Sequence, residues 1–169
     1  MKLFLTGDKQ VGKTTVIEKV LSGYTGSVGG FVTQKLFSQQ VGQNQIYLFD
    51  INDTERKREQ QNAVALCGLA QIQKAYPKVF NNAGVKTLTT KPQPSLIVMD
   101  ELGRIESDAA KFKRAVLRLL HADVHVLGVI QQKDTKFLNE VKMHPAVVLM
   151  EVTEQNRNDL PGEILNKLK

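Results

Sequence analysis

The chain has 169 residues and a formal charge of +6, and 41% of its residues are hydrophobic, which is typical of a single globular domain over residues 1–169. The one cysteine, Cys67, excludes an internal disulfide and a cysteine-rich zinc site. Because no apolar run approaches the roughly 20 residues that cross a bilayer and no secretory signal is visible, we expect a cytoplasmic protein that does not contact membranes.

The first residues predict a strand, a phosphate-binding loop and a helix. Residues 1–6 have the apolar character of a short buried strand, and apolar residues recur on one helical face from Lys13 to about Gly23. Residues 7–14 between them, GDKQVGKT, match the pattern G-x-x-x-x-G-K-[ST]. A strand before this pattern and a helix after it form the setting in which backbone N–H groups and the positive helix end hold a polyphosphate.

The residues of this loop have different expected roles in binding a nucleotide. Lys13 is expected to reach the β- and γ-phosphates and to take part in catalysis, while the Thr14 hydroxyl is expected to ligate Mg²⁺. Asp8, Lys9 and Gln10 are expected to face solvent. The predicted nucleotide-binding segment comprises Gly7, Asp8, Lys9, Gln10, Val11, Gly12, Lys13, Thr14 and Thr15.

The next segment predicts a β-hairpin followed by irregular chain. Residues 31–37 and 46–51 have strand character and are joined by a tight polar turn at residues 41–44. Such a hairpin adds an antiparallel pair to a sheet that is otherwise parallel. Residues 52–62 are charged and have no clear period, so we expect a loop there.

Helices and apolar strands alternate through the rest of the chain. We expect a helix over residues 77–88, stopped by the prolines at 92 and 94, and a buried strand over residues 95–99. Ser107 or Asp108 is expected to cap a helix that ends near residue 120. The remaining predicted elements are strands at 124–130 and 146–152 and helices at 137–141 and 160–168. This alternation indicates an α/β fold, a three-layer α/β/α sandwich with a mainly parallel central sheet and an antiparallel hairpin.

A second motif, LIVMDELG at residues 96–103, places two acids at the end of an apolar strand. Proteins with a phosphate-binding loop use an acid in this position to hold the Mg²⁺ shell, and we expect Asp100 to do so. Glu101 is then placed to orient and polarise the water that attacks the γ-phosphate. The alternative is that both acids only mark a strand that leaves the core for solvent.

Four short motifs occur in the order of one known family. They are VGKTT at 11–15, GFVT at 30–33, DELGR at 100–104 and VTEQNR at 152–157. With these motifs the chain resembles the cancer-related nucleoside-triphosphatase family of small P-loop nucleoside-triphosphate phosphohydrolases. The resemblance implies a P-loop NTPase fold and Mg²⁺-dependent hydrolysis of ATP, GTP and other nucleoside triphosphates to the diphosphate and phosphate, with broad base tolerance.

The last motif also bears on the nucleotide base. The resemblance implies a base pocket near Asn156 and Arg157, and a position just after a strand end is where α/β sheets form ligand crevices. Arg157 could stack on a base and Asn156 could hydrogen-bond it. The alternative is that Asn158 caps the last helix and that Arg157 lies on the surface.

The chain departs from the family pattern after GFVT. Gln34 and Lys35 stand where family members tend to carry acidic residues, and their effect on activity stays open. Arg56 or Arg58 can match an arginine of the family's next loop, but the sequence does not decide whether either acts as an arginine finger. Without an arginine finger we expect slow hydrolysis.

Other functions share parts of this pattern. A P-loop kinase for a nucleoside or small metabolite uses the same loop, and a nucleotide-dependent regulatory binding protein would need no catalysis. A regulatory GTPase is disfavoured because residues 131–134 are Gln-Gln-Lys-Asp where such proteins carry Asn-Lys-x-Asp. The basic residues are dispersed without a groove-reading motif, so nucleic acid is not the expected partner, and we expect a monomer or weak oligomer.

Overall fold

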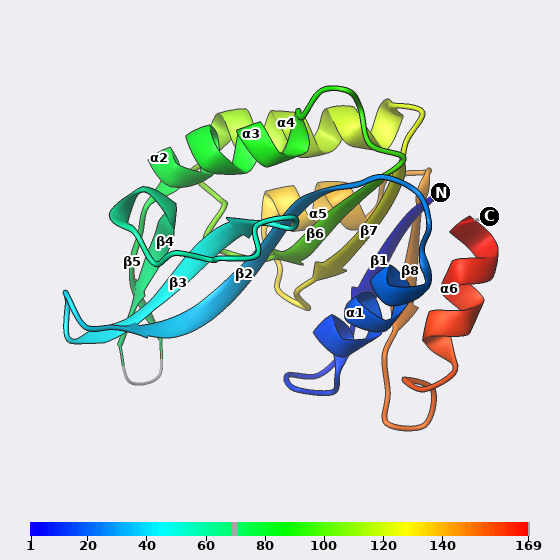
Figure 1. Ribbon diagram of the computed structural model, residues 1–169, viewed down its shortest axis with the longest axis horizontal. Helices are drawn as coiled ribbons and strands as arrows, with labels where there is room; N and C mark the ends of the chain where they lie inside the picture. Colours follow the sequence, from blue (N-terminus) through cyan, green and yellow to red (C-terminus); the bar gives the residue numbers. More distant parts are fainter. Residues whose placement is uncertain (69–70, 169) are drawn as a thin grey trace.

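The computed structural model, which describes residues 1–68 and 71–168, is built on an eight-stranded sheet in the order β5-β4-β3-β2-β6-β7-β1-β8. Strands β2, β6, β7, β1 and β8 pair in parallel, while β3, β4 and β5 continue the sheet with antiparallel pairs (Figure 1). The strands are β1 (Lys2–Thr6), β2 (Val28–Ser38), β3 (Gln43–Asp50), β4 (Ala63–Cys67), β5 (Ile72–Ala75), β6 (Leu96–Leu102), β7 (His125–Ile130) and β8 (Val147–Glu151).

Helices cover both faces of this sheet, which confirms the predicted three-layer α/β/α fold (Figure 1). One apolar core separates the sheet from α1 and α6, and a second core lies under α2, η2, α3, α4 and α5. Within the described residues, no helix has the length and apolar character needed to cross a membrane. The helices are α1 (Lys13–Gly23), η1 (Gln60–Asn62), α2 (Pro77–Val79), the π-helical η2 (Phe80–Gly84), α3 (Val85–Leu88), α4 (Ala110–His121), α5 (Lys136–Lys142) and α6 (Leu160–Leu168).

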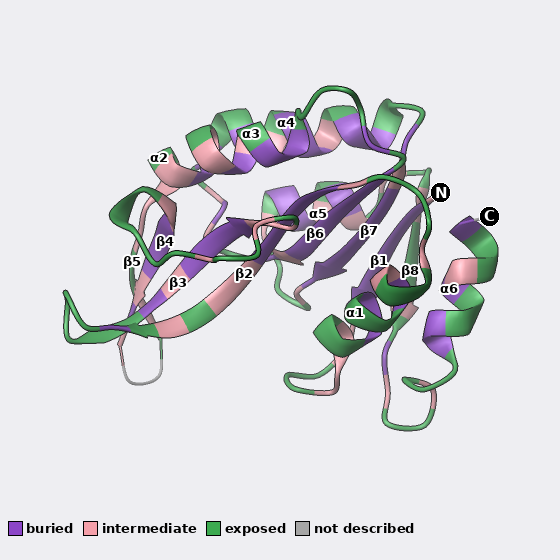
Figure 2. Ribbon diagram, in the orientation of Figure 1, coloured by how far each residue is buried: buried purple, intermediate pink, exposed green. Residues whose placement is uncertain are grey.

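The central strands are apolar because both of their faces are covered. Residues 96–99 of β6 are 0% exposed, and Figure 2 shows the central strands almost entirely as buried. A strand covered on both faces has no solvent side, so its sequence shows a continuous apolar run rather than alternation. The same burial extends to the end of β6, where Asp100 is only 5% exposed.

The predicted hairpin is confirmed, but it is part of a longer antiparallel extension. Strands β2 and β3 pair in register from Phe31 opposite Asp50 to Ser38 opposite Gln43. Strands β4 and β5 follow, and the sequence pattern did not predict either of them. Strand β4 is AVALC, and alanine has little preference for strands, so its conformation depends on pairing with β3. The loop expected at 52–62 is confirmed, apart from the single turn of η1 at its end.

Helix α4 is capped by a distant residue rather than by its own sequence. The prediction that Ser107 or Asp108 caps this helix is wrong, because the N-cap position is Ala109. The Oδ1 atom of Asn81 instead accepts hydrogen bonds from backbone N–H groups at residues 111 and 112, at 2.9 and 3.1 Å. This contact ties the start of α4 to η2 and satisfies two N–H groups that an α-helix leaves without internal partners.

We predict that Asn81→Ala lowers the free energy of unfolding by about 1 kcal/mol, the usual cost of losing a helix cap. For a chain of this size the melting temperature should fall by about 2–4 °C. Asn82→Ala is the matched control, because Asn82 lies in the same π-helical segment with an exposed side chain. Thermal denaturation of both variants measures the difference, and equal melting temperatures would contradict this account of the cap.

Candidate active site

The loop between β1 and α1 has the backbone conformation of an anion-binding nest. Gly7, Gln10 and Gly12 have φ values of 129°, 62° and 110°, in the left-handed region that side chains disfavour. At Gly7 a Cβ atom would lie 2.5 Å from the carbonyl oxygen of Val152, so glycine is required there. The loop runs into the first turn of α1, whose N–H groups and dipole favour an anion.

Lys13 lies across this loop. Its Nζ atom donates hydrogen bonds to the backbone carbonyls of Gly7 and Asp8, at 2.8 and 2.6 Å. Asp8, Lys9 and Gln10 are exposed, as expected, but Asp8 and Lys9 also line the pocket described below. The ammonium group therefore stays within the loop, close to where the loop's N–H groups would hold a phosphate.

Asp100 and Thr14 lie together beside the loop. Burial raises the pKa of the Asp100 carboxyl to about 6, and the charges of Glu101 and Glu18 act in the same direction. A hydrogen bond from the Thr14 hydroxyl and the positive charge of Lys13 act to lower that pKa. A buried carboxyl next to a hydroxyl provides the hard oxygen donors that suit Mg²⁺, so these two residues fit the expected cation.

Few other side chains are available as metal ligands near this pair. Residues 1–68 and 71–168 contain no group of three or more His, Cys, Asp or Glu side chains that could hold a metal ion. A cation at Asp100 and Thr14 would therefore need further oxygen ligands from water and phosphate, which is the usual coordination of Mg²⁺ in nucleotide sites.

Two side chains from neighbouring strands orient Glu101. The Thr33 hydroxyl of β2 accepts a hydrogen bond from the Glu101 N–H at 3.3 Å and donates to the Asp100 carbonyl at 3.2 Å. The Nε2 atom of Gln131, just after β7, donates to Oε1 of Glu101. Glu101 is thus held at two points: the Gln131 amide holds one oxygen of its carboxylate, and the Thr33 hydroxyl holds its backbone N–H.

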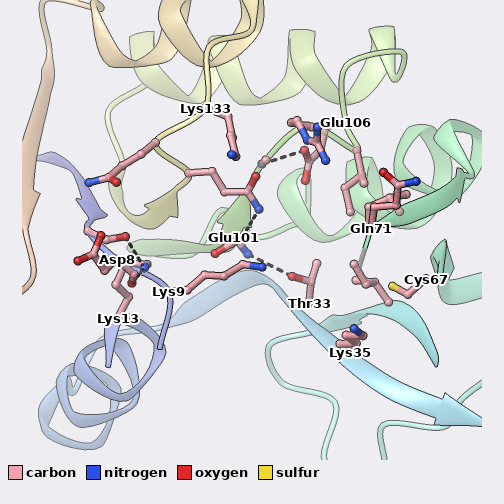
Figure 3. Close-up of a pocket in the computed structure, with 18 residues that line it drawn as sticks. Asp8, Lys9, Lys13, Thr33, Lys35, Cys67, Gln71, Glu101, Glu106 and Lys133 are labelled. Atoms are coloured by element: carbon pink, nitrogen blue, oxygen red, sulfur yellow. Dashed lines mark hydrogen bonds between the residues drawn. The ribbon is translucent and has the colours of Figure 1, made fainter. Parts of the chain in front are cut away.

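Glu101 and the phosphate-binding loop share a pocket of about 770 Å³ (Figure 3). One wall comes from the end of β6 and the segments that follow β1, β6 and β7, and the opposite wall from β2, β3, β4 and β5. The pocket therefore depends on the antiparallel extension that the sequence pattern did not predict in full. The predicted site residues on its walls are Gly7, Asp8, Lys9, Lys13 and Glu101.

The remaining predicted nucleotide-binding residues lie outside this pocket. Arg157 contacts the phosphate-binding loop through a hydrogen bond from Nη1 to the Val11 carbonyl, at 3.2 Å. Gln10, Val11, Gly12, Thr14, Thr15 and Asn156 are likewise not among the residues that line the pocket. The structure thus divides the predicted residues into two groups. One group lines the pocket together with Glu101, and the other lies outside the pocket, where Arg157 contacts the phosphate-binding loop.

The Asn156 side chain is used by its own loop. Its Oδ1 atom accepts from the Thr153 N–H at 2.8 Å, and its Nδ2 atom donates to the Glu151 carbonyl at 2.8 Å. The Thr153 hydroxyl in turn accepts from the Asn156 N–H at 3.3 Å. Asn156 therefore stabilises the turn after β8, whereas the exposed Arg157 is the residue of this pair with room to meet a base.

Three cationic side chains line the pocket although the sequence pattern assigns them no catalytic role. Arg104, from the DELGR motif, and Lys133, two residues after Gln131, both line it, as does Lys35. Neither Arg56 nor Arg58 lines the pocket, and Arg58 donates from Nη1 to the Phe37 carbonyl at 3.0 Å. One sequence signal pointed to Gln131 and Lys133, since both follow an apolar strand whose carboxyl end meets the same edge of the sheet as Glu101.

Comparison with known proteins gives a consistent set of relatives. A family model described as NTPase matches residues 2–165. The chain is 32% identical over 172 residues to nucleoside-triphosphatase THEP1 of Thermotoga maritima, covering 100% of this chain and 96% of that protein. It is 29% identical over 185 residues to the cancer-related nucleoside-triphosphatase homolog of Bos taurus, covering 99% and 96%.

Two solved structures share the fold. The crystal structure of THEP1 from Aquifex aeolicus has a TM-score of 0.76 at 23% identity and covers 100% of this chain and 99% of that one. The solution structure of a human cancer-related nucleoside triphosphatase has a TM-score of 0.70 at 24% identity, with 99% and 97% covered. At this level of identity the likeness shows a common fold, the P-loop NTPase fold, and not a common substrate.

We predict that Asn156→Ala destabilises the protein, because it removes two side-chain hydrogen bonds, each contributing about 1 kcal/mol. The free energy of unfolding should fall by about 1–3 kcal/mol. Arg157→Ala is the control, since Arg157 is exposed and makes one bond to the neighbouring loop. Urea denaturation compares the two, and a loss in the Arg157 variant as large as in the Asn156 variant would contradict the assignment.

Proposed function

This chain belongs to the NTPase family, and we propose that it hydrolyses nucleoside triphosphates such as ATP and GTP to the diphosphate and phosphate with the help of Mg²⁺. The observation that carries the proposal is that Glu101, oriented by Gln131 and Thr33, lines one pocket with the phosphate-binding loop. A nucleophile-activating acid and a phosphate cradle on one pocket are the two parts that triphosphate hydrolysis requires.

The loop and Lys13 would hold the triphosphate. The nest conformation and the start of α1 present N–H groups to the phosphate oxygens. Lys13 would exchange its two carbonyl partners for the β- and γ-phosphates, because a charged oxygen is a stronger acceptor than a carbonyl. Asp100 and Thr14 would hold Mg²⁺, which when bound neutralises charge on the β- and γ-phosphates.

Glu101 would accept the proton of the attacking water. As the water oxygen bonds to the γ-phosphorus, the bond from that phosphorus to the bridging oxygen breaks and the nucleoside diphosphate leaves. The water proton moves to the Glu101 carboxylate. Gln131 holds the other end of this group in place, since its amide donates to Oε1 and leaves Oε2 for the water.

The base side of the site supports broad base tolerance. Asn156 is bonded to Thr153 and Glu151, and Arg157 is exposed. Strong discrimination between bases needs buried polar groups that a wrong base would leave unpaired. An exposed guanidinium stacks on any base, so it contributes affinity without choosing among them.

We propose that hydrolysis is slow because the cations in the pocket are not held against the γ-phosphate. Lys35 and Arg104 are exposed, and no ion pair or hydrogen bond within the described residues orients either side chain toward the loop. An arginine finger raises the rate of such hydrolysis by about 10³–10⁵ when it is held against the γ-phosphate. An Arg104 side chain that is not held against the γ-phosphate supplies only part of that effect.

A second candidate function is phosphoryl transfer to a small hydroxyl compound. The observation that favours it is the extent of the pocket, which runs from the phosphate-binding loop to Ile46, Cys67 and Ile72 and so has a side away from the loop on which an acceptor could lie. An alcohol oxygen in place of water would attack the same phosphorus and give its proton to the same Glu101 carboxylate.

Phosphate release from ATP and GTP tests the two candidates together. With Mg²⁺ and no acceptor, we expect release of phosphate from both nucleotides at similar rates, and removal of the metal with EDTA should abolish it. Adding a nucleoside or glycerol as acceptor should leave the rate unchanged. Turnover that requires the acceptor would overturn hydrolysis in favour of the kinase, and nucleotide binding without any turnover would overturn both.

We predict that Glu101→Gln lowers kcat by about 10²–10⁴ because the amide cannot accept the water proton. Nucleotide affinity should stay within about twofold, since in this scheme Glu101 holds neither the phosphates nor the Mg²⁺ ion. Glu163→Gln, an exposed change on α6, is the matched control and should have the wild-type rate. Phosphate release and calorimetric titration with a non-hydrolysable nucleotide measure the two quantities.

Lys13→Ala should behave differently from Glu101→Gln in the same experiment. This variant should lose nucleotide binding and turnover together, because the polyphosphate loses its principal side-chain cation. A Glu101→Gln variant that keeps wild-type turnover would remove Glu101 from the mechanism, even with Lys13 behaving as expected.

A further inference from the structure

Glu106 is a buried acid on the wall of the pocket that the proposed hydrolysis does not use. It lies in the turn after β6 and is only 1% exposed. Its Oε2 atom accepts a hydrogen bond from the Gly103 N–H at 2.9 Å. Its Oε1 atom is buried and has no hydrogen-bond partner within the described part of the chain, and Glu106 lines the same pocket as Glu101 (Figure 3).

Among the residues that the structure describes, no Lys, Arg or His side chain forms an ion pair with this acid. The ion pair found within residues 1–68 and 71–168 joins Lys57 to Glu55, both well exposed. Burying a carboxylate without a counter-charge is costly, and the usual outcome is that the group keeps its proton. The titratable and charged residues that share the pocket with Glu106 are Asp8, Lys9, Lys13, Lys35, Cys67, Glu101, Arg104 and Lys133.

The protonation state follows from this environment. Burial raises the pKa of Glu106 to about 8, hydrogen bonds from the Glu106 and Gly103 backbone act to lower it, and the Glu101 charge adds to the rise. At neutral pH the side chain is then a carboxylic acid. Because Oε2 accepts from Gly103, the proton lies on Oε1, the atom that needs a partner.

We propose that Glu106 is a positioning residue for the hydrolysis: as a neutral acid it fixes the turn after Glu101 through Oε2, and its lack of charge leaves Glu101 as the carboxylate that acts on the attacking water. This inference rests on the proposed function. The Oε1 atom is too buried to meet a water in the pocket, so Glu106 acts through the turn and through its charge state and does not touch the water. An ionised Glu106 would place a second negative charge near Glu101.

Ionisation of Glu106 should therefore inhibit the enzyme. It adds a second negative charge near Glu101, where the γ-phosphate must also approach. Glu106→Gln keeps the neutral state at every pH, and its amide oxygen can still accept from Gly103.

The pH dependence of turnover tests the role in hydrolysis. Between pH 7 and pH 9, kcat of the wild type should fall about tenfold relative to Glu106→Gln, which is the change in the protonated fraction of an acid with a pKa of about 8. Glu163→Gln is the control and should keep the wild-type profile. An alkaline loss of the same size in Glu106→Gln would overturn the proposal.

Two measurements on the resting protein test the neutral acid without any turnover. Infrared difference spectra of the wild type should show a protonated-carboxyl band that disappears near pH 8 and is missing from Glu106→Gln. Absence of such a band from the wild type at pH 7 would overturn the proposal, and the wild type alone decides this even where the variant does not fold.

The melting temperature gives the second measurement. An unfolded Glu106 ionises above its ordinary pKa of 4.5, while the folded one stays neutral until about pH 8, so folding of the wild type becomes less favourable across this range. The melting temperature of Glu106→Gln minus that of the wild type should thus rise from about pH 5 to about pH 8 and then level off. A constant difference would contradict the neutral acid. If the protein does not hydrolyse nucleotides, the infrared band and the pH-dependent difference in melting temperature should still be seen. The proposal for Glu106 and the proposed function can therefore be refuted separately.

Discussion

The parallel pairing of β6, β7 and β1 is the constraint on which the site depends. Parallel strands end at the same edge of a sheet, so the residues that follow each strand meet there although they are far apart in the chain. Thr6 leads into the phosphate-binding loop, Glu101 lies near the end of β6 and Gln131 follows β7. The bond from Gln131 to Glu101 is a direct result of this arrangement.

Burial at this edge separates the acids into different chemical states. Asp100 and Glu106 are both almost inaccessible, but Asp100 has a hydroxyl and a nearby lysine that favour its charge, while Glu106 has only backbone donors. The pKa is accordingly about 6 for Asp100 and about 8 for Glu106. Near neutral pH Asp100 is therefore an anion suited to a cation, whereas Glu106 is a neutral acid.

The antiparallel part of the sheet determines the space in which these groups act. Strands β3, β4 and β5 carry Ile46, Cys67 and Ile72 to the wall opposite Glu101. Without them the end of β6 would face solvent, where a single acid is easily hydrated and a water is not held. Enclosure lowers the local dielectric, and this strengthens each charge and hydrogen bond around the reacting phosphate.

The sequence by itself determined the features that depend on neighbouring residues: the phosphate-binding loop before a helix, the acids after an apolar run, the hairpin and the α/β alternation. Only the tertiary structure decided how Thr33, 68 positions from Glu101, and Gln131, 30 positions away, hold that residue. The same holds for the Asn81 cap of α4, strands β4 and β5, and the solitary burial of Glu106. A short stretch of sequence indicates the backbone conformation and which face is buried. These contacts instead form when distant strands pair and distant helices pack, and a short stretch does not identify those partners.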